Sequence, residues 1–100
     1  MPEAKKIEMV KPNVSRVHPL GNGTQDIYRF KNGYGASVVK FDGSYGYPNL
    51  YELAVVKFYG EEIDAFHVDS TTRITDDVLG WQTPEDVQAV LKRISRLRKK

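Results

Sequence analysis

The stretch of sequence that decides the fold is residues 26–41, which read DIYRFKNGYGASVVKF. Two short runs of β-forming residues, Ile27–Phe30 and Gly35–Phe41, flank a turn at Asn32 and Gly33. An Asn-Gly pair supplies the positive φ angles that a tight hairpin turn requires. The stretch therefore predicts a β-hairpin, and no catalytic or metal-binding motif comes with it.

The segments that follow extend this hairpin into a sheet. Residues 42–49 hold two glycines and a proline, which predicts a loop. Residues 51–59 are a nearly continuous run of β-formers, and residues 62–68 alternate between two faces as a returning strand does. We expect residues 27–68 to form an antiparallel β-meander, and the whole sheet to have four to five strands.

A helix is predicted close to the carboxyl terminus. Thr83 suits the N-cap, Pro84 suits the first helical position, and acidic residues follow where the helix dipole favours them. One apolar stripe runs along the helix through Val87, Val90, Leu91, Ile94 and Leu97. Because a lone helix and an uncovered sheet each leave an apolar face in water, we predict an α+β fold with the helix packed on one face of the sheet.

The flanking segments are less regular. Prolines and a Gly/Asn cluster interrupt residues 1–25, which we expect to form an irregular arm before a single α+β domain at residues 26–100. Residues 69–80 predict a polar connection to the helix. We expect Ile74, Val78 and Leu79 of this connection, and Trp81 directly after it, to anchor it on the core.

Composition excludes several classes of protein. One hundred residues suffice for one domain, and the lack of cysteine excludes disulfides, thiol catalysis and Cys-ligated metal sites. No apolar run approaches the ~18 residues of a membrane span, and the amino terminus lacks the apolar segment of a secretory signal. We therefore expect a cytoplasmic protein without membrane association or cofactor, either a monomer or a small homo-oligomer.

Charge is segregated along the chain, although the net charge is only +2. Residues 61–86 carry eight acids and one base, whereas residues 87–100 carry six bases and no acid. This layout favours either attraction of a charged partner or complementarity between parts of the same chain.

Two motifs have a catalytic or ligand-binding interpretation beside a structural one. Gly33 and Gly35 resemble the start of a dinucleotide-binding loop, but the third glycine and the following helix are missing, which favours the hairpin. His67 and Asp69 have the alternate spacing of a general-base pair, which is also that of any polar strand end. We expect no enzyme and no metal site.

Candidate protein-binding residues lie in a loop and in the acidic segment. Tyrosines on a loop shaped by Gly and Pro are typical of recognition surfaces, although the rings also fit a position over the sheet edge. Adjacent carboxylates lack calcium-loop spacing and suit a basic partner instead. The candidates are Tyr45, Tyr47, Glu61, Glu62, Asp76 and Asp77.

The alternative is a nucleic-acid surface. Aromatic and basic residues between positions 28 and 47 have the types that hold single strands, and the basic carboxyl end can contact phosphates. The candidate phosphate contacts are Arg93, Arg96, Arg98, Lys99 and Lys100.

At residues 29–39, 43–46, 50–56 and 74–81 the chain resembles a group of small bacteriophage and prophage proteins. The resemblance covers about residues 27–97 and implies action inside an infected bacterium, without assigning catalytic residues or a cofactor. Our leading hypothesis is a non-enzymatic phage accessory protein that binds a host bacterial protein and modulates or inhibits it. Nucleic-acid binding is the alternative.

Overall fold

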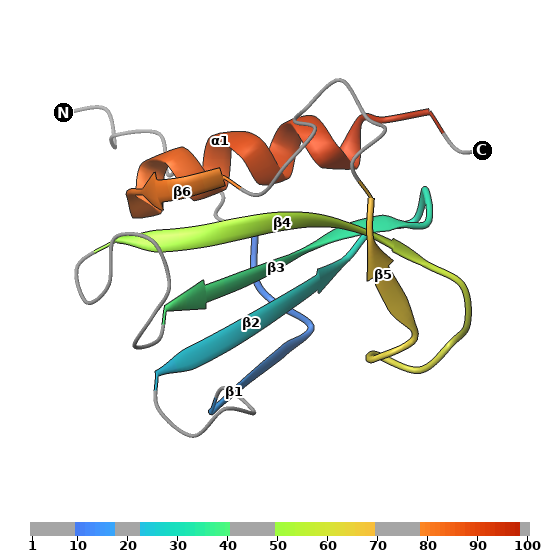
Figure 1. Cartoon of the computed structure of the whole chain (residues 1–100). Helices are drawn as coiled ribbons and strands as arrows, with labels where there is room; N and C mark the ends of the chain where they lie inside the picture. The colour runs from blue at the N-terminus through green and yellow to red at the C-terminus, as the bar shows by residue number, and fades with distance from the viewer. Residues whose placement is uncertain (1–9, 18–22, 41–49, 70–78, 99–100) are drawn as a thin grey trace, which may run out of the picture.

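The computed structural model describes residues 10–17, 23–40, 50–69 and 79–98, and it has the predicted α+β architecture (Figure 1). A six-stranded antiparallel sheet carries one helix across one face. In chain order the elements are β1 (Val14–Val17), β2 (Thr24–Arg29), β3 (Tyr34–Lys40), β4 (Tyr51–Phe58), β5 (Phe66–Val68), β6 (Leu79–Gln82) and α1 (Pro84–Ser95). The predicted carboxy-terminal helix on an antiparallel sheet is confirmed.

The strands follow one another as a meander, with one addition. Neighbours in the order β1-β2-β3-β4-β5 all pair antiparallel. Strand β6 also pairs with β4, at its amino-terminal half, while β5 pairs with its carboxy-terminal half. Strands β5 and β6 therefore share the side of β4 that faces away from β3.

The β2–β3 hairpin has a three-residue loop instead of the two-residue turn that an Asn-Gly pair favours. Phe30 N–H donates to the Tyr34 carbonyl and Gly33 N–H to the Phe30 carbonyl, so the loop is residues 31–33. Only Gly33, at φ 88°, takes a positive φ there. Two residues on, a methyl group at Gly35 would lie 1.9 Å from the carbonyl oxygen of Tyr28, so only glycine fits this strand position. The hairpin therefore explains why both positions of the dinucleotide-like motif are glycine.

Helix α1 begins as its sequence predicts. Thr83 Oγ1 accepts a hydrogen bond from Asp86 N–H, and the Asp86 carboxylate accepts one from Thr83 N–H, each at 3.1 Å. This capping box satisfies backbone donors that the first turn leaves unpaired. Pro84 is the first helical residue.

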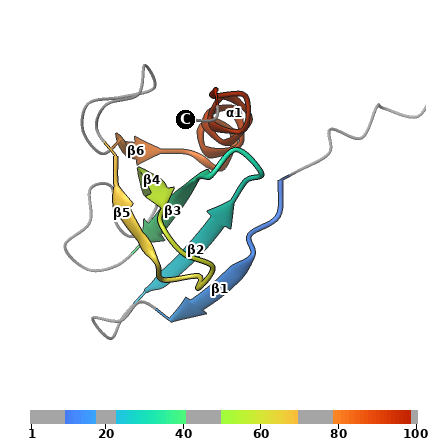
Figure 2. The same ribbon diagram turned by 90° about the vertical axis from the view of Figure 1, so that its right-hand side faces the viewer.

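The sheet buries side chains on both faces. Buried residues of β2, β3 and β4 meet the helix in the larger cluster: Tyr28, Tyr34, Ala36, Val38, Leu53, Val55, Val87, Val90, Leu91 and Ile94. The opposite face has a smaller cluster around Ile27, Val56 and Phe58, against which Val14, Ile63 and Phe66 pack. The strands curl around this second cluster, so that β1 and β5 both lie over it (Figure 2).

Two predictions about strands need correction. The expected irregular arm at residues 1–25 contains all of β1 and the start of β2, because Val14–Val17 pairs with Thr24–Ile27 across the sheet. The strand expected at residues 62–68 is limited to Phe66–Val68. Before it the chain turns, with Ala65 N–H donating to the Glu62 carbonyl and Phe66 N–H to the Asp64 carbonyl.

The anchors predicted for residues 69–81 have mixed outcomes. Leu79 packs against the larger cluster, as expected. Trp81 is not a core residue, since 65% of its surface is exposed. Ile74 and Val78 lie outside the described residues. No helix within the described ranges is long and apolar enough to cross a membrane.

We predict that Leu91→Ala and Ile94→Ala each lower the free energy of unfolding by about 2–4 kcal/mol, because both side chains are fully buried. Urea denaturation of the purified variants measures this loss. Arg93→Ala, on the exposed side of the same helix, is the control and should stay within about 0.5 kcal/mol of wild type. Core variants as stable as this control would contradict the packing described above.

Candidate functional site

The structure places the predicted site residues unevenly. Glu61 and Glu62 are exposed in the turn that joins β4 to β5. Arg93, Arg96 and Arg98 are exposed at the carboxyl end of α1. The other candidates, Tyr45, Tyr47, Asp76, Asp77, Lys99 and Lys100, lie outside the described residues.

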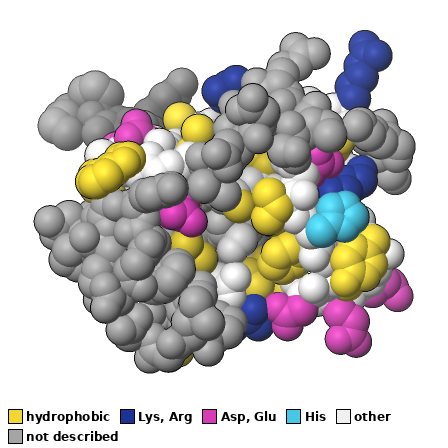
Figure 3. Space-filling model, viewed as in Figure 1, with side chains coloured by type: hydrophobic (Ala, Val, Ile, Leu, Met, Phe, Trp, Pro, Cys, Tyr) yellow, Lys and Arg dark blue, Asp and Glu magenta, His cyan; other side chains and the backbone are white. Residues whose placement is uncertain are grey.

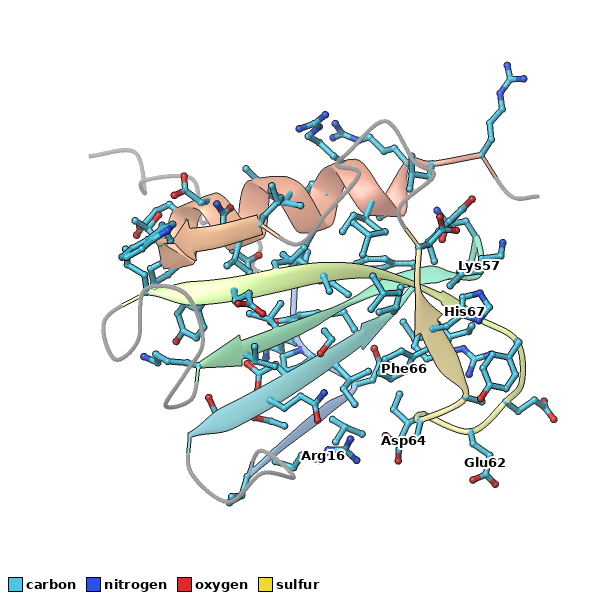
Figure 4. The ribbon with its side chains drawn as sticks, in the orientation of Figure 1. Arg16, Lys57, Glu62, Asp64, Phe66 and His67 are labelled. Atoms are coloured by element: carbon cyan, nitrogen blue, oxygen red, sulfur yellow. The ribbon has the colours of Figure 1, made fainter. Side chains whose placement is uncertain are left out.

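An exposed aromatic pair stands beside the acidic turn. Tyr59, 70% exposed, follows β4, and its ring stacks on that of His67 in β5 with centroids 5.7 Å apart and planes at 18°. Val68, the next residue of β5, is 55% exposed. Figure 3 shows the histidine among hydrophobic and acidic side chains at this end of the molecule, and Figure 4 places His67 near Lys57 and above Glu62.

Strand β5 also presents backbone groups to its outer side. Ala65 accepts a hydrogen bond from Tyr59 N–H, and Asp69 N–H donates to the Val55 carbonyl, so these two residues direct backbone groups toward β4. Backbone direction alternates along an antiparallel strand, so Phe66 and Val68 direct theirs away from β4, although Phe66 N–H already donates to the Asp64 carbonyl. Within the described part of the chain, no strand pairs with that outer side. An open edge next to exposed apolar side chains is a template for association.

Trp81 is the second exposed aromatic feature, and its backbone explains why. Tyr51 pairs with Gln82 and Leu53 with Leu79, so Gly80 and Trp81 both stand opposite Glu52 in a β-bulge. Trp81 has φ 61°, the only positive φ of a non-glycine residue in the described segments. A bulky side chain in this conformation costs of order 1–3 kcal/mol, and such strain concentrates at functional sites.

These two features lie on the same side of β4. Lys57 pairs with His67, and the bulge stands opposite Glu52. The two features are therefore five positions apart along β4. At ~3.4 Å per residue this separation is ~17 Å, well within the footprint of one ordinary protein interface. We call this surface the β5–β6 edge, defined by Tyr59, Glu61, Glu62, His67, Val68 and Trp81. Sequence reasoning found its two glutamates but missed its aromatic residues.

Contacts from β1 and β2 fix the acidic turn. Arg16 Nη2 lies 2.7 Å from Asp64 Oδ1, and Arg29 Nη1 donates to the Glu61 carbonyl at 2.9 Å. The Arg16 hydrogen bond holds the pKa of Asp64 below its usual value and raises the pKa of Arg16. Figure 4 shows Arg16 beside Asp64, with Glu62 on the same turn. Glu61 and Glu62 are thus held beside Tyr59.

The structure gives little support to His67 as a catalytic base. The ring is exposed and stacked on Tyr59, and it lines no described pocket. Among the residues that the structure describes, no three His, Asp or Glu side chains gather in a way that could hold a metal ion.

The basic carboxyl end of α1 gains a contribution from the β2–β3 loop. Asn32 Nδ2 donates to the carbonyls of Ile94 and Leu97, each at 2.9 Å, and so ties the loop to the carboxyl end of α1. This contact brings the exposed Lys31 to the end of α1 that carries the arginines. The sequence did not predict this pairing, because residues 31 and 98 are far apart in the chain.

Comparisons of the chain with protein-family models, with curated proteins and with solved structures give no match.

One core tyrosine gives a pH prediction. Burial, with smaller contributions from the Asp26 carboxylate and Tyr51, raises the pKa of Tyr28 from 10.0 to about 12. The folded protein therefore holds this proton more tightly than the unfolded chain does. The resulting stabilisation is complete below pH 10 and is lost as the pH rises from 10 to 12.

We expect wild type to lose about 1–3 kcal/mol of stability across that range beyond the loss of Tyr28→Phe, which has no phenol to ionise. Urea denaturation at several pH values compares the two proteins. Parallel stability curves for wild type and variant would show that Tyr28 ionises as readily in the folded state as in the unfolded one.

Proposed function

We propose that this protein acts by binding another protein through the β5–β6 edge. In line with its resemblance to small phage and prophage proteins, we propose a host bacterial protein as the partner, whose activity the binding modulates or inhibits. The observation that carries the proposal is the placing of exposed Tyr59, Val68 and the strained Trp81 on one side of β4.

The residue types support a protein partner. Tryptophan and tyrosine are enriched among the few residues that carry most of the energy of an interface, and exposed apolar side chains that gather on one surface, unlike single ones, mark interaction sites. The same edge offers outward backbone groups on β5, which suit an added strand. Association by this route needs no catalytic group.

The charges beside the aromatic residues favour a partner with a basic patch. Glu61 and Glu62 are exposed in a turn that is held in place by contacts of Arg16 with Asp64 and of Arg29 with the Glu61 carbonyl. Exposed rim carboxylates of this kind mainly raise the association rate and select against acidic surfaces. We therefore expect binding to weaken moderately, and not to vanish, as salt increases.

The test is affinity capture from bacterial lysate followed by mass spectrometry, with matched variants. We expect wild type to enrich a protein that the double variant Tyr59→Ser, Trp81→Ser loses by at least about tenfold, the loss expected for hot-spot residues. Val17→Ser is the control, because Val17 is 69% exposed but lies in β1 at the opposite edge of the sheet. Equal capture by the double variant, or no capture by wild type at low and physiological salt, would contradict the proposal.

A second candidate function, nucleic-acid binding, is favoured by one contact. Because Asn32 caps the carboxyl end of α1, Lys31 joins Arg93, Arg96 and Arg98 at one end of the molecule. Convergence of cations from two distant segments supports a phosphate-binding surface more than a basic helix end alone does.

Gel-shift titration with single- and double-stranded DNA and RNA tests this candidate. The affinity for nucleic acid should fall steeply as salt rises. Arg93→Ala combined with Arg96→Ala should reduce the slope of log affinity against log salt by the equivalent of about two phosphate contacts. Lys11→Ala, an exposed cation outside the basic end, is the control. Absence of any shift at micromolar protein in low salt would reject nucleic-acid binding.

A further inference from the structure

A small pocket lies between the sheet and the amino-terminal half of α1, away from the turn between β4 and β5. Its volume is about 170 Å³, and its lining is Asp26, Tyr28, Val38, Tyr51, Pro84, Val87 and Gln88. One water occupies ~30 Å³ in the liquid, and pockets for drug-sized ligands start at ~300 Å³. The pocket therefore suits a group the size of one side chain.

The Asp26 carboxylate gives the pocket an acceptor with spare capacity. Asp26 Oδ1 accepts the Ser15 hydroxyl at 2.6 Å, and in the described residues this carboxylate has no ion pair. An ionised carboxylate offers about four lone-pair sites, so several remain for a ligand that brings donors.

The Asp26 carboxylate and the two phenols lie close to one another. The effect of Asp26 and Tyr51 on the Tyr28 pKa, described above, requires their proximity. The strand register places Asp26 opposite Val38, while Tyr28 in β2 and Tyr51 in β4 line the same pocket from either side of β3. The pocket thus combines one negative charge with two aromatic rings.

The remaining walls are apolar except for Gln88, whose side chain is held in place. Val38, Val87 and Pro84 present hydrocarbon, and Gln88 is held in place by Val10, whose N–H and carbonyl bond its side chain at 2.7 and 3.1 Å. Hydrocarbon walls suit an alkyl stem, whereas aromatic rings and a carboxylate suit a cationic head. Tyr51 already contacts one ammonium in this way, with Lys40 Nζ 4.5 Å from its ring centroid.

We propose that this pocket binds a primary ammonium group on an alkyl chain, with Asp26 as the counter-ion and Tyr28 and Tyr51 as aromatic walls. The natural source is either the lysine side chain of a bound polypeptide or a free alkylamine. The proposal does not depend on the β5–β6 edge, so the failure of either leaves the other standing.

The experiment is a two-dimensional ¹H–¹⁵N NMR titration of the full chain with three probes. These are Nα-acetyl-lysine methylamide, butylamine, and Nα-acetyl-norleucine methylamide, which lacks the ammonium group. We expect saturable shifts at the amides of Asp26, Tyr28 and Gln88 with the lysine probe and not with the norleucine probe. Tighter binding of the lysine probe than of butylamine assigns a polypeptide lysine, and equal binding assigns a free amine.

Matched variants test the role of the carboxylate. Asp26→Asn keeps an acceptor for Ser15 and removes the charge, so the lysine probe should bind at least about tenfold more weakly. Glu85→Gln, an exposed acid in the first turn of α1, removes the same charge outside the pocket and should change the affinity less than about twofold. If Asp26→Asn does not fold, Tyr51→Leu replaces it, since it removes one aromatic wall, with an expected loss of several-fold. Equal shifts with lysine and norleucine probes, equal effects of the two charge variants, or no saturable shift would overturn the proposal.

Discussion

The structure depends on the burial of β3 on both of its faces. Every residue from Tyr34 to Val39 is buried, so this strand needs a cover on each side. Helix α1 covers one face with its apolar stripe, against which Leu97 also packs, and the curled strands on either side enclose the other. The contact at Gly35 shows how tight this arrangement is, because the backbone of β2 leaves no room there for even a methyl group. A central strand without an exposed face forces the rest of the chain to wrap around it.

Closure over the second face relies mainly on apolar contacts. The ion pair of Arg16 with Asp64 joins two exposed side chains, and such pairs contribute ~0–1 kcal/mol. Packing of Phe66 on Phe58, with ring centroids 5.4 Å apart, buries area and contributes more. Strand β5 is therefore held by a few side chains and a three-residue ladder. Short, weakly held edge elements open and adapt at lower cost than a core strand, which suits a surface that receives a partner.

The parts of the fold that could be predicted from the sequence are those with local signals. The Thr83 capping box, the apolar stripe of α1 and the hairpin glycine all act within a few residues. Strand β6 was missed because it is four residues long and pairs with the distant β4, whereas β1 pairs with the next strand but is short and flanked by prolines and a Gly/Asn cluster. The β5–β6 edge and the pocket could not be predicted either, since their residues, such as 26, 51 and 88 in the pocket, become neighbours only in three dimensions. The two glutamates of the edge were found because charge is visible in the sequence, whereas exposure of an aromatic ring is not.

Trp81 is the residue at which local preference and fold disagree most. Its size and hydrophobicity predict a core position, yet the β-bulge opposite Glu52 turns it outward and gives it a φ that glycine adopts more easily. Strand β6 needs the bulge, because without the extra residue Leu79 and Gln82 could not both face their partners on β4. The bulge does not need a tryptophan, since a glycine at the same position would relieve the strain and remove the exposed ring. The conflict therefore has no explanation in stability, and contact with a partner, as proposed above, would account for both the strain and the exposure.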